Sequence, residues 1–185
     1  LMIDIGTNGE MVLGNKYRRI ACSTAAGPAF EGARISCGMR GAPGAVDHVS
    51  VQNGRIHFHT IGNIPPKGIC GSGLLDLTAS LLDTGILTDS GILAESPYYL
   101  DNSTVSLTQK DISELQLAKS AIRSGIELLA NKMSVNISDI QKVYLAGAFG
   151  SYMNPASACR IGMIPSVLLD RIEAVGNIAG EGAKL

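Results

Sequence analysis

Two glycine-rich segments, each directly after a short apolar run, limit most strongly how this chain can fold. The first is Gly6–Gly9, which follows the run Leu1–Asp4, and the second is Gly147–Gly150, which follows Val143–Ala146. Short apolar runs bounded by glycine are typical of strands that end in tight turns. Because two more strand-like segments follow the first turn, the sequence predicts an antiparallel meander at the start of the chain.

The rest of the chain alternates strand and helix signals. Asn53-Gly54 is the strongest two-residue hairpin signal, and Thr108 with Asp111 is an N-cap pair before a long apolar-periodic stretch. The predicted elements are strands at 1–4, 10–14 and 17–21, a short helix at 25–34, hairpin strands at 46–52 and 55–61, helices at 74–83 and 108–133, a strand at 143–146, a helix starting at Asn154-Pro155, a strand at 173–175 and a Gly/Ala-rich helix at 177–185.

Composition excludes several classes of protein. The 185 residues carry 15 Lys+Arg against 16 Asp+Glu, whereas nucleic-acid binders carry an excess of cations. No apolar run approaches the roughly 18 residues that span a bilayer, and no signal-peptide pattern is present. We therefore expect a cytoplasmic protein with neither nucleic acid nor a membrane as partner. Since the sequence opens in mid-strand and stops in mid-helix, we also expect it to be a fragment of a longer protein.

The four cysteines, Cys22, Cys37, Cys70 and Cys159, form no C-x-x-C pair. This spacing disfavours zinc or iron–sulfur ligation within the chain and favours reduced, mostly buried thiols. A reactive thiol at Cys70 is the less favoured alternative.

The first glycine-rich turn contains residue types that suit a phosphate and a magnesium ion. Asp4 at a strand end can hold a hydrated Mg²⁺. Gly6 and Gly9 would let backbone amides approach phosphate oxygens, and Thr7 and Asn8 would add side-chain hydrogen bonds. The alternative interpretation is a plain hairpin turn.

The second glycine-rich segment contains small residues at the end of a strand. Gly147, Ala148 and Gly150 would let a flat ring or a ribose lie against the backbone. The alternative is close packing between a strand and a helix.

Further candidate residues have an ordinary structural interpretation that we favour. The predicted hairpin places His48, His57 and His59 on one face, with His48 opposite His59. These histidines could form a metal-like cluster or contact a cofactor, but we favour a solvated polar face. The loop Gly68–Gly73 could present amides to an anion or form a tight turn. On the long helix, Lys119 and Arg123 could reach a nucleotide or, as we favour, remain at the surface.

The order of these elements resembles one ATP-binding lobe of the superfamily of acetate and sugar kinases, heat-shock chaperones and actin. The stretches DIGTNGE, ACSTAAGPAFEGA, ISCGMRGAPGA, GICGSGLLDL, LTQKDISELQLAKSAIRSGIELL and VYLAGAFG resemble, more specifically, the C-terminal domain of the reductive activators of corrinoid proteins, often labelled as iron–sulfur or ferredoxin-like proteins. The resemblance runs over residues 1–185. It implies an α/β fold, a ribonuclease-H-like (actin-like ATPase) lobe with an inserted hairpin-and-helix subdomain at 41–107.

The resemblance implies a function as well. Such activators use ATP to return Co(II) corrinoid on a methyl-transfer protein to Co(I), with electrons from an iron–sulfur cluster near the N-terminus. Asp4 would then act on the Mg²⁺ side, residues 6–9 would hold phosphates, and Gly147, Ala148 and Gly150 would line the adenosine. Glu31 would approach the ribose or lie on a helix surface.

Two parts of the family pattern are absent from this sequence, namely the iron–sulfur ligands and the first phosphate motif of a preceding lobe. The expected partners are therefore ATP and a corrinoid protein, with the electron-transfer centre elsewhere, no hydrolytic residue assigned and a homodimer left open. A small-molecule kinase of the same superfamily and a non-catalytic interaction domain are the alternatives.

Overall fold

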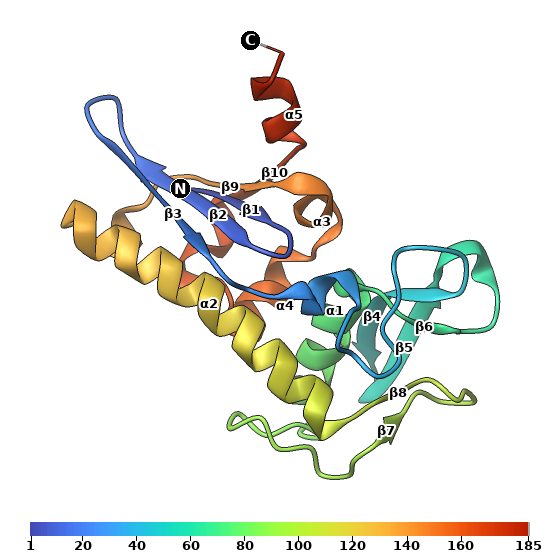
Figure 1. The fold of residues 1–185 in the computed structure, drawn as a ribbon. Coiled ribbons are helices and arrows are strands. Elements are labelled where there is room, and N and C mark those ends of the chain that lie inside the picture. The colour runs from blue at the N-terminus through green and yellow to red at the C-terminus, as the bar shows by residue number, and fades with distance from the viewer. Residues whose placement is uncertain (185) are drawn as a thin grey trace. The chain divides into compact units, whose positions relative to one another are not determined.

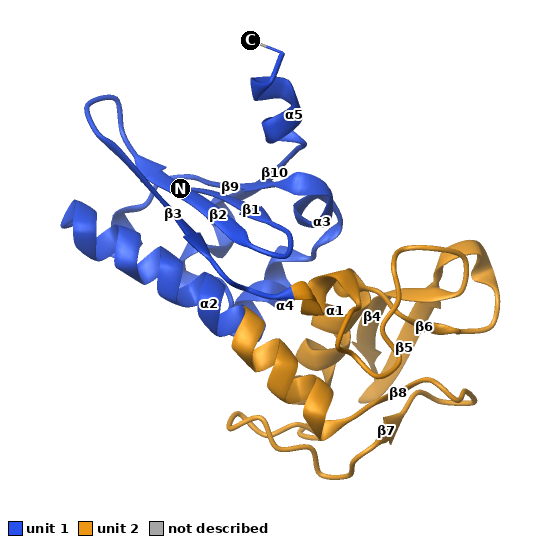
Figure 2. Ribbon diagram, viewed as in Figure 1, with its two compact units in different colours: residues 1–27, 119–185 blue, residues 28–118 orange. Residues whose placement is uncertain are grey.

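The computed structural model describes residues 1–184, which form two compact units (Figures 1 and 2). The first unit combines residues 1–27 with 119–185, and the second comprises residues 28–118. The second unit contains the predicted subdomain of residues 41–107 and extends beyond it on both sides.

The first unit is built on a five-stranded mixed sheet with the strand order β10-β9-β1-β2-β3. The pairs β1–β2 and β2–β3 are antiparallel, so the predicted meander is confirmed, whereas β9 and β10 run parallel to β1. The strands are β1 (Met2–Ile5), β2 (Gly9–Gly14), β3 (Arg19–Thr24), β9 (Val143–Ala146) and β10 (Ile172–Gly176).

The third strand starts later than predicted, because the turn before it is longer than the sequence pattern indicated. The side-chain oxygen of Asn15 accepts hydrogen bonds from the amides of Tyr17 and Arg18, at 2.9 and 3.0 Å. This Asx-type turn occupies Tyr17 and Arg18, the first two residues of the predicted strand.

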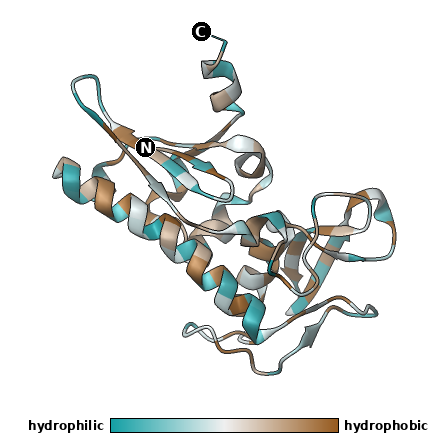
Figure 3. Ribbon diagram, in the orientation of Figure 1, coloured by the Kyte–Doolittle hydropathy of each residue, from teal (hydrophilic) through white to brown (hydrophobic). Residues whose placement is uncertain are grey.

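The long helix α2 (Gln109–Met133) begins in the second unit, and its residues from 119 onward cover one face of the sheet of the first unit (Figure 2). Ile3 and Met11 on that face are buried, as is Ile122 of the helix. A Cβ on Gly9 would overlap Ile122, and one on Gly125 would lie 2.7 Å from the Met11 methyl group, so both glycines permit close packing. Figure 3 shows hydrophobic and hydrophilic positions alternating along α2, as the helical spacing predicts.

Short helices complete the first unit. Asn154 accepts a hydrogen bond from the Ala156 amide at 2.9 Å, with Pro155 at the first helical position, as predicted for α4. The short elements are η3 (Ile137–Asp139), α3 (Gly147–Tyr152), α4 (Pro155–Arg160), η4 (Ser166–Arg171) and α5 (Ile178–Gly182). Residue 185, the end of the predicted last helix, lies outside the described part.

The second unit contains the predicted hairpin in its predicted register. His48 pairs with His59 and Ser50 with His57 around the turn at 53–54. Helix α1 packs against β4, and a Cβ on Gly73 would overlap the Val46 carbonyl. The elements of this unit are η1 (Pro28–Glu31), β4 (Ala45–Gln52), β5 (Arg55–Thr60), η2 (Ile61–Asn63), β6 (Gly68–Ile69), α1 (Gly71–Asp83), β7 (Tyr98–Tyr99) and β8 (Ser106–Leu107).

The predicted helix at 25–34 is wrong in extent, because only the 3₁₀ turn η1 forms there. Gly27 and Gly32 flank this turn with φ values of 77° and 80°. A left-handed residue on each side ends the helical path after a single turn.

The predicted cap of α2 is confirmed. The Thr108 amide donates to the Asp111 carboxylate at 2.8 Å, and the Asp111 amide donates to the Thr108 hydroxyl at 3.2 Å. Asp111 is fully buried and also accepts from the Ser36 amide at 2.7 Å. One carboxylate therefore caps the helix and fixes a distant loop of the same unit.

Candidate functional site

The carboxyl ends of two adjacent parallel strands meet at Asp4 and Gly147. Asp4 on β1 pairs in register with Ala146, the last residue of β9, and Gly147 begins α3 directly afterwards. Gly147 has φ +81°, and a Cβ at this position would overlap the Asp4 Oδ1 atom. The absence of a side chain at Gly147 thus lets the carboxylate lie against the start of a helix. Ligands of open α/β sheets bind at this end of parallel strands.

The electrostatics of Asp4 favour a cation beside it. Partial burial and the nearby Glu10 carboxylate raise the pKa of Asp4 above its ordinary value, with burial the larger cause. Glu10 lies directly across the β1–β2 pair, and its carboxylate accepts a hydrogen bond from the Ser23 hydroxyl at 3.2 Å. Two carboxylates on one face repel each other, and a divalent cation would relieve that repulsion.

The turn after Asp4 has an open side. The Gly6 amide donates to the Asn8 carbonyl at 2.8 Å, and Thr7 and Asn8 are exposed. A Cβ added to Gly6 would meet only the Asn8 carbonyl oxygen, at 3.9 Å. The Cβ direction of Gly6 is therefore open, whereas the predicted phosphate residue Gly9 is buried against α2 and has a packing reason to be glycine.

The second predicted motif, at the start of α3, likewise contains both an exposed residue and a buried glycine with a packing role. Ala148 is exposed, and the first amides of a helix lack acceptors within it. Gly150 is buried, where a Cβ would lie 3.2 Å from the Leu145 carbonyl carbon. Gly147 therefore lies against Asp4, Ala148 follows it at the exposed start of the helix, and Gly150 permits the helix to pack on its own strand.

An apolar hollow adjoins the carboxylates on the exposed face of the sheet. Its volume is about 590 Å³, and Asp4 and Glu10 form part of its wall. A hollow that is apolar apart from a few polar groups is typical of a small-molecule site. Apolar lining comes from Met2, Val12, Ala146, Ile178 and Ala179.

Glu10 is the residue that our sequence interpretation missed. The signal was available, because the tight turn between Asp4 and Glu10 places the two residues opposite each other across an antiparallel pair. The sequence pattern alone marks Glu10 only as the first residue of the second predicted strand.

Lys119 and Arg123 bind backbone carbonyls of the first unit. The Lys119 ammonium donates to the Ile161 carbonyl at 2.5 Å, and Arg123 donates to the Gly162 carbonyl at 3.5 Å. Burial, together with the Arg123 charge, lowers the pKa of Lys119. Both side chains thus satisfy the carbonyls that follow α4.

The glycine-rich loop before α1 has a packing explanation. A Cβ on Gly68 would lie 2.7 Å from the Cys37 carbonyl oxygen, and one on Gly73 would overlap Val46. The geometry therefore favours the tight turn over the anion loop. Glu31, the expected ribose contact, lies exposed at the end of η1 in the second unit.

Within residues 1–184, no cluster of three or more His, Cys, Asp or Glu side chains is arranged to hold a metal ion. None of the helices in this range combines the length and the apolarity needed to cross a bilayer.

Comparisons with known proteins agree with one another. The family model described as the C-terminal domain of RACo, the ASKHA domain, matches residues 1–185. The corrinoid activation enzyme RamQ of Eubacterium limosum is 36% identical over 215 residues, covering 100% of this chain and 36% of the relative. The [Co(II) methylated amine-specific corrinoid protein] reductase of Methanosarcina barkeri is 30% identical, covering 89% of this chain and 34% of the relative.

A solved structure is similar over nearly the whole chain. It is a reductive activator for corrinoid, iron–sulfur protein, with a TM-score of 0.87 and 38% sequence identity, matching 99% of this chain and 33% of its own. The ribonuclease-H-like, actin-like ATPase fold is therefore confirmed. The chain spans about a third of the length of each of these relatives.

Proposed function

Since the chain belongs to the family of C-terminal ASKHA domains of corrinoid activators, we propose that it is the ATP-binding domain of an ATP-dependent reductive activator. The whole protein would return Co(II) corrinoid, bound to a methyl-transfer protein, to Co(I). Two relatives are named for corrinoid activation or reduction, and a solved neighbour is named as a reductive activator. These names favour an activator over a small-molecule kinase or an interaction domain.

The observation that carries the proposal is the contact between Asp4 and Gly147. Asp4 has a raised pKa and no side-chain partner of opposite charge within the described residues, so it fits a hydrated Mg²⁺. Bound Mg·ATP would supply the free energy of nucleotide binding and hydrolysis. Gly6, Thr7 and Asn8 would orient the phosphates from the open turn.

The adenosine side of the proposed site lies at the start of α3. Gly147 and Ala148 would border the ribose or base, and Gly150 would hold the helix close enough to its strand for that contact. Phosphate contact by Gly9 remains part of the proposal, through its backbone alone, because its side-chain position is filled by Ile122.

The redox centre belongs, in this proposal, to another part of the protein. The four cysteines of the chain are free thiols. Cys37 and Cys70 lie on neighbouring segments of the second unit, whereas Cys22 and Cys159 belong to the first unit, and an iron–sulfur cluster needs several thiolates at one place. Free thiols also fit a cytoplasmic location. ATP can drive an uphill reduction only if it binds one state of the activator or its complex more tightly than another.

The experiment is corrinoid reduction by the full-length protein with Asp4→Asn. We expect the variant to lose ATP-dependent formation of Co(I), which is measured by the visible absorption of the corrinoid, and to bind Mg·ATP more weakly. Asp170→Asn is the matched control, since Asp170 is an exposed carboxylate of the same unit. Normal ATP-dependent reduction by the Asp4→Asn protein would refute the assigned site. Transfer of phosphate to a small acceptor, without cobalt reduction, would favour the kinase.

A further inference from the structure

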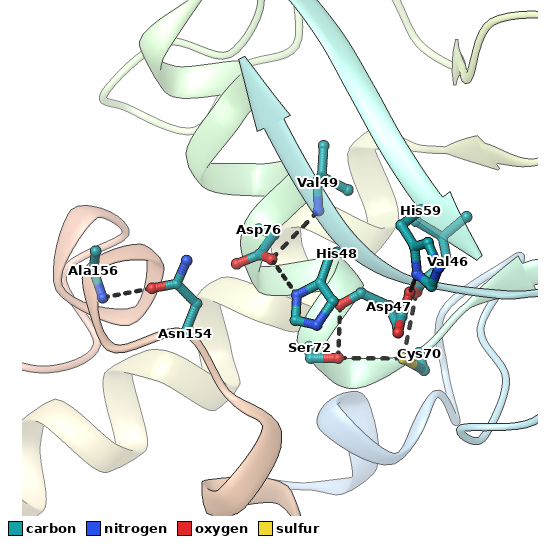
Figure 4. A network of polar contacts seen from close by, with 10 residues as sticks. All are labelled: Val46, Asp47, His48, Val49, His59, Cys70, Ser72, Asp76, Asn154 and Ala156. Atoms are coloured by element: carbon teal, nitrogen blue, oxygen red, sulfur yellow. Dashed lines mark hydrogen bonds and ion pairs between the residues drawn. The ribbon is translucent and has the colours of Figure 1, made fainter. Parts of the chain in front are cut away.

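The hairpin of the second unit presents two histidines side by side. His48 on β4 and His59 on β5 are cross-strand partners, and their ring centroids lie 6.5 Å apart with an interplanar angle of 41° (Figure 4). The side chains are 62% and 49% exposed. The strand pairing therefore fixes the backbone under both rings, while solvent still reaches them.

Each of these imidazoles has a carboxylate at its Nδ1 atom. Asp76 Oδ2 lies 3.4 Å from His48 Nδ1, and Asp47 Oδ1 lies 2.7 Å from His59 Nδ1. Asp76 is 2% exposed on α1, and it also accepts from the Val49 amide at 3.3 Å. A carboxylate at Nδ1 favours the tautomer with the proton on that nitrogen, in which the lone pair of Nε2 is free for another ligand.

We propose that His48 and His59 form a two-histidine site for a divalent transition-metal ion such as Zn²⁺ or Ni²⁺. The Nε2 atoms would ligate the ion, and Asp76 and Asp47 would orient the rings from behind, an arrangement common around metal-bound histidines. Imidazole nitrogens suit these ions, and the two carboxylates supply negative charge beside them. Water, or a group of a bound partner, would fill the remaining positions.

The two ring centroids lie farther apart than a shared ion requires. With metal–nitrogen bonds of about 2.0–2.1 Å, two imidazoles on one tetrahedral ion have centroids roughly 5 Å apart. The rings must therefore approach by rotation of their side chains. His48 can make this movement, because it is largely exposed and its contact with Asp76 is long.

The third histidine of the chain provides a built-in control. His57 lies on the same strand and the same exposed face as His59, but its cross-strand partner is Ser50. Among residues 1–184, no carboxylate contacts its ring nitrogens. The proposal therefore predicts that His57 stays outside the site although it differs from the pair only in its neighbours.

The test is a titration of the chain with Zn²⁺ alone, followed by NMR of the histidine ring signals. We expect the signals of His48 and His59 to shift together and saturably, and those of His57 to stay in place. Long-range nitrogen–proton spectra of the metal-free chain should show the proton on Nδ1 of both ligands. A titration in which no ring responds, or all three respond alike, would overturn the proposal.

Variants separate ligation from a structural effect. His48→Ala and His59→Ala should each abolish the saturable shift of the remaining partner, whereas His57→Ala should leave it unchanged. Asp47→Asn, at a partly exposed position, should weaken Zn²⁺ binding by about 10- to 100-fold with both ligands still present. Equal binding by His57→Ala and His48→Ala would contradict the site. Because no step involves nucleotide or corrinoid, these results are independent of the proposed ATP-binding function.

Discussion

The single missing side chain at Gly147 allows the Asp4 carboxylate to lie at the start of α3. A Cβ there would overlap Asp4 Oδ1, and φ is +81°. Gly176 has a similar φ of +72°, yet its Cβ would meet nothing within 4 Å. The two glycines therefore share the backbone strain of a substitution and differ in the contact with Asp4.

We predict that Gly147→Ala lowers both stability and Mg·ATP affinity, whereas Gly176→Ala lowers stability alone. Each alanine should cost about 1–2 kcal/mol of left-handed backbone strain, and Gly147→Ala should cost more because Asp4 must move. Thermal unfolding of the two variants and nucleotide titration of the full-length protein measure this. Equal loss of affinity in both variants would mean that strain, and not Asp4, explains the effect.

Asp4 should destabilise the chain in the absence of a cation. Its pKa is raised in the folded state, so the folded chain binds more protons than the unfolded chain between the ordinary carboxyl pKa and the raised value. Stability must then decrease as pH rises through that window. We predict that Asp4→Asn stabilises the ligand-free chain at neutral pH and removes this slope.

Denaturant unfolding at several pH values checks the prediction, with Asp170→Asn as the exposed control. A stabilising change that also abolishes Mg·ATP binding is the pattern expected of a functional carboxylate. A less stable Asp4→Asn chain at neutral pH would show that the carboxylate is structural.

At the residue scale, the sequence predicted that Asp4 and Gly147 lie at the ends of strands, as the structure has them. It could not tell which of the nearby glycines are needed for packing. Gly9 and Gly150 follow the same pattern as Gly6 and Gly147, yet their missing side chains make room for Ile122 and Leu145. Those neighbours come from helix packing that no local spacing encodes. The position of Glu10 opposite Asp4 follows from strand pairing across the turn, so the sequence could have indicated it.

At the scale of elements, strong local signals were sufficient to predict the hairpin and the start of α2. The Asn53-Gly54 turn set the hairpin register, and the capping pair set the start of α2. The 3₁₀ turn η1 was predicted as a longer helix, because the sequence does not show that Gly27 and Gly32 both adopt positive φ. Backbone conformation imposed by tertiary structure was the missing information.

The capping carboxylate Asp111 should contribute more than an ordinary cap. It accepts from the Thr108 and Ser36 amides and from both of their hydroxyls. We predict that Asp111→Ala costs about 3 kcal/mol, because buried donors lose a charged acceptor. Ser113→Ala in the same helical turn, where the exposed hydroxyl donates to the Gln109 carbonyl at 3.1 Å, should change stability by no more than about 0.5 kcal/mol. Chemical denaturation compares the two, and similar losses would contradict a special role for Asp111.

At the scale of the whole molecule, the chain spans about a third of the length of its relatives. The resemblance to the superfamily places a first phosphate motif in a preceding lobe, so Asp4 and Gly147 would supply one side of a two-sided nucleotide site. A ligand that binds the native state raises its stability in proportion to RT ln(1 + [L]/Kd). A protein that contacts the nucleotide from both sides should therefore gain more than this chain alone.

We predict that saturating Mg·ATP raises the Tm of the full-length protein by several degrees, and that of the 185-residue chain by much less. For a domain of this size, a stabilisation of about 1 kcal/mol raises the Tm by roughly 2–4 °C. Asp4→Asn should remove the shift in the full-length protein, because the cation side of the site is then lost. Differential scanning calorimetry with and without Mg·ATP makes the comparison. An equal shift in the isolated chain would show that residues 1–185 contain a complete nucleotide site, and would contradict the two-sided site.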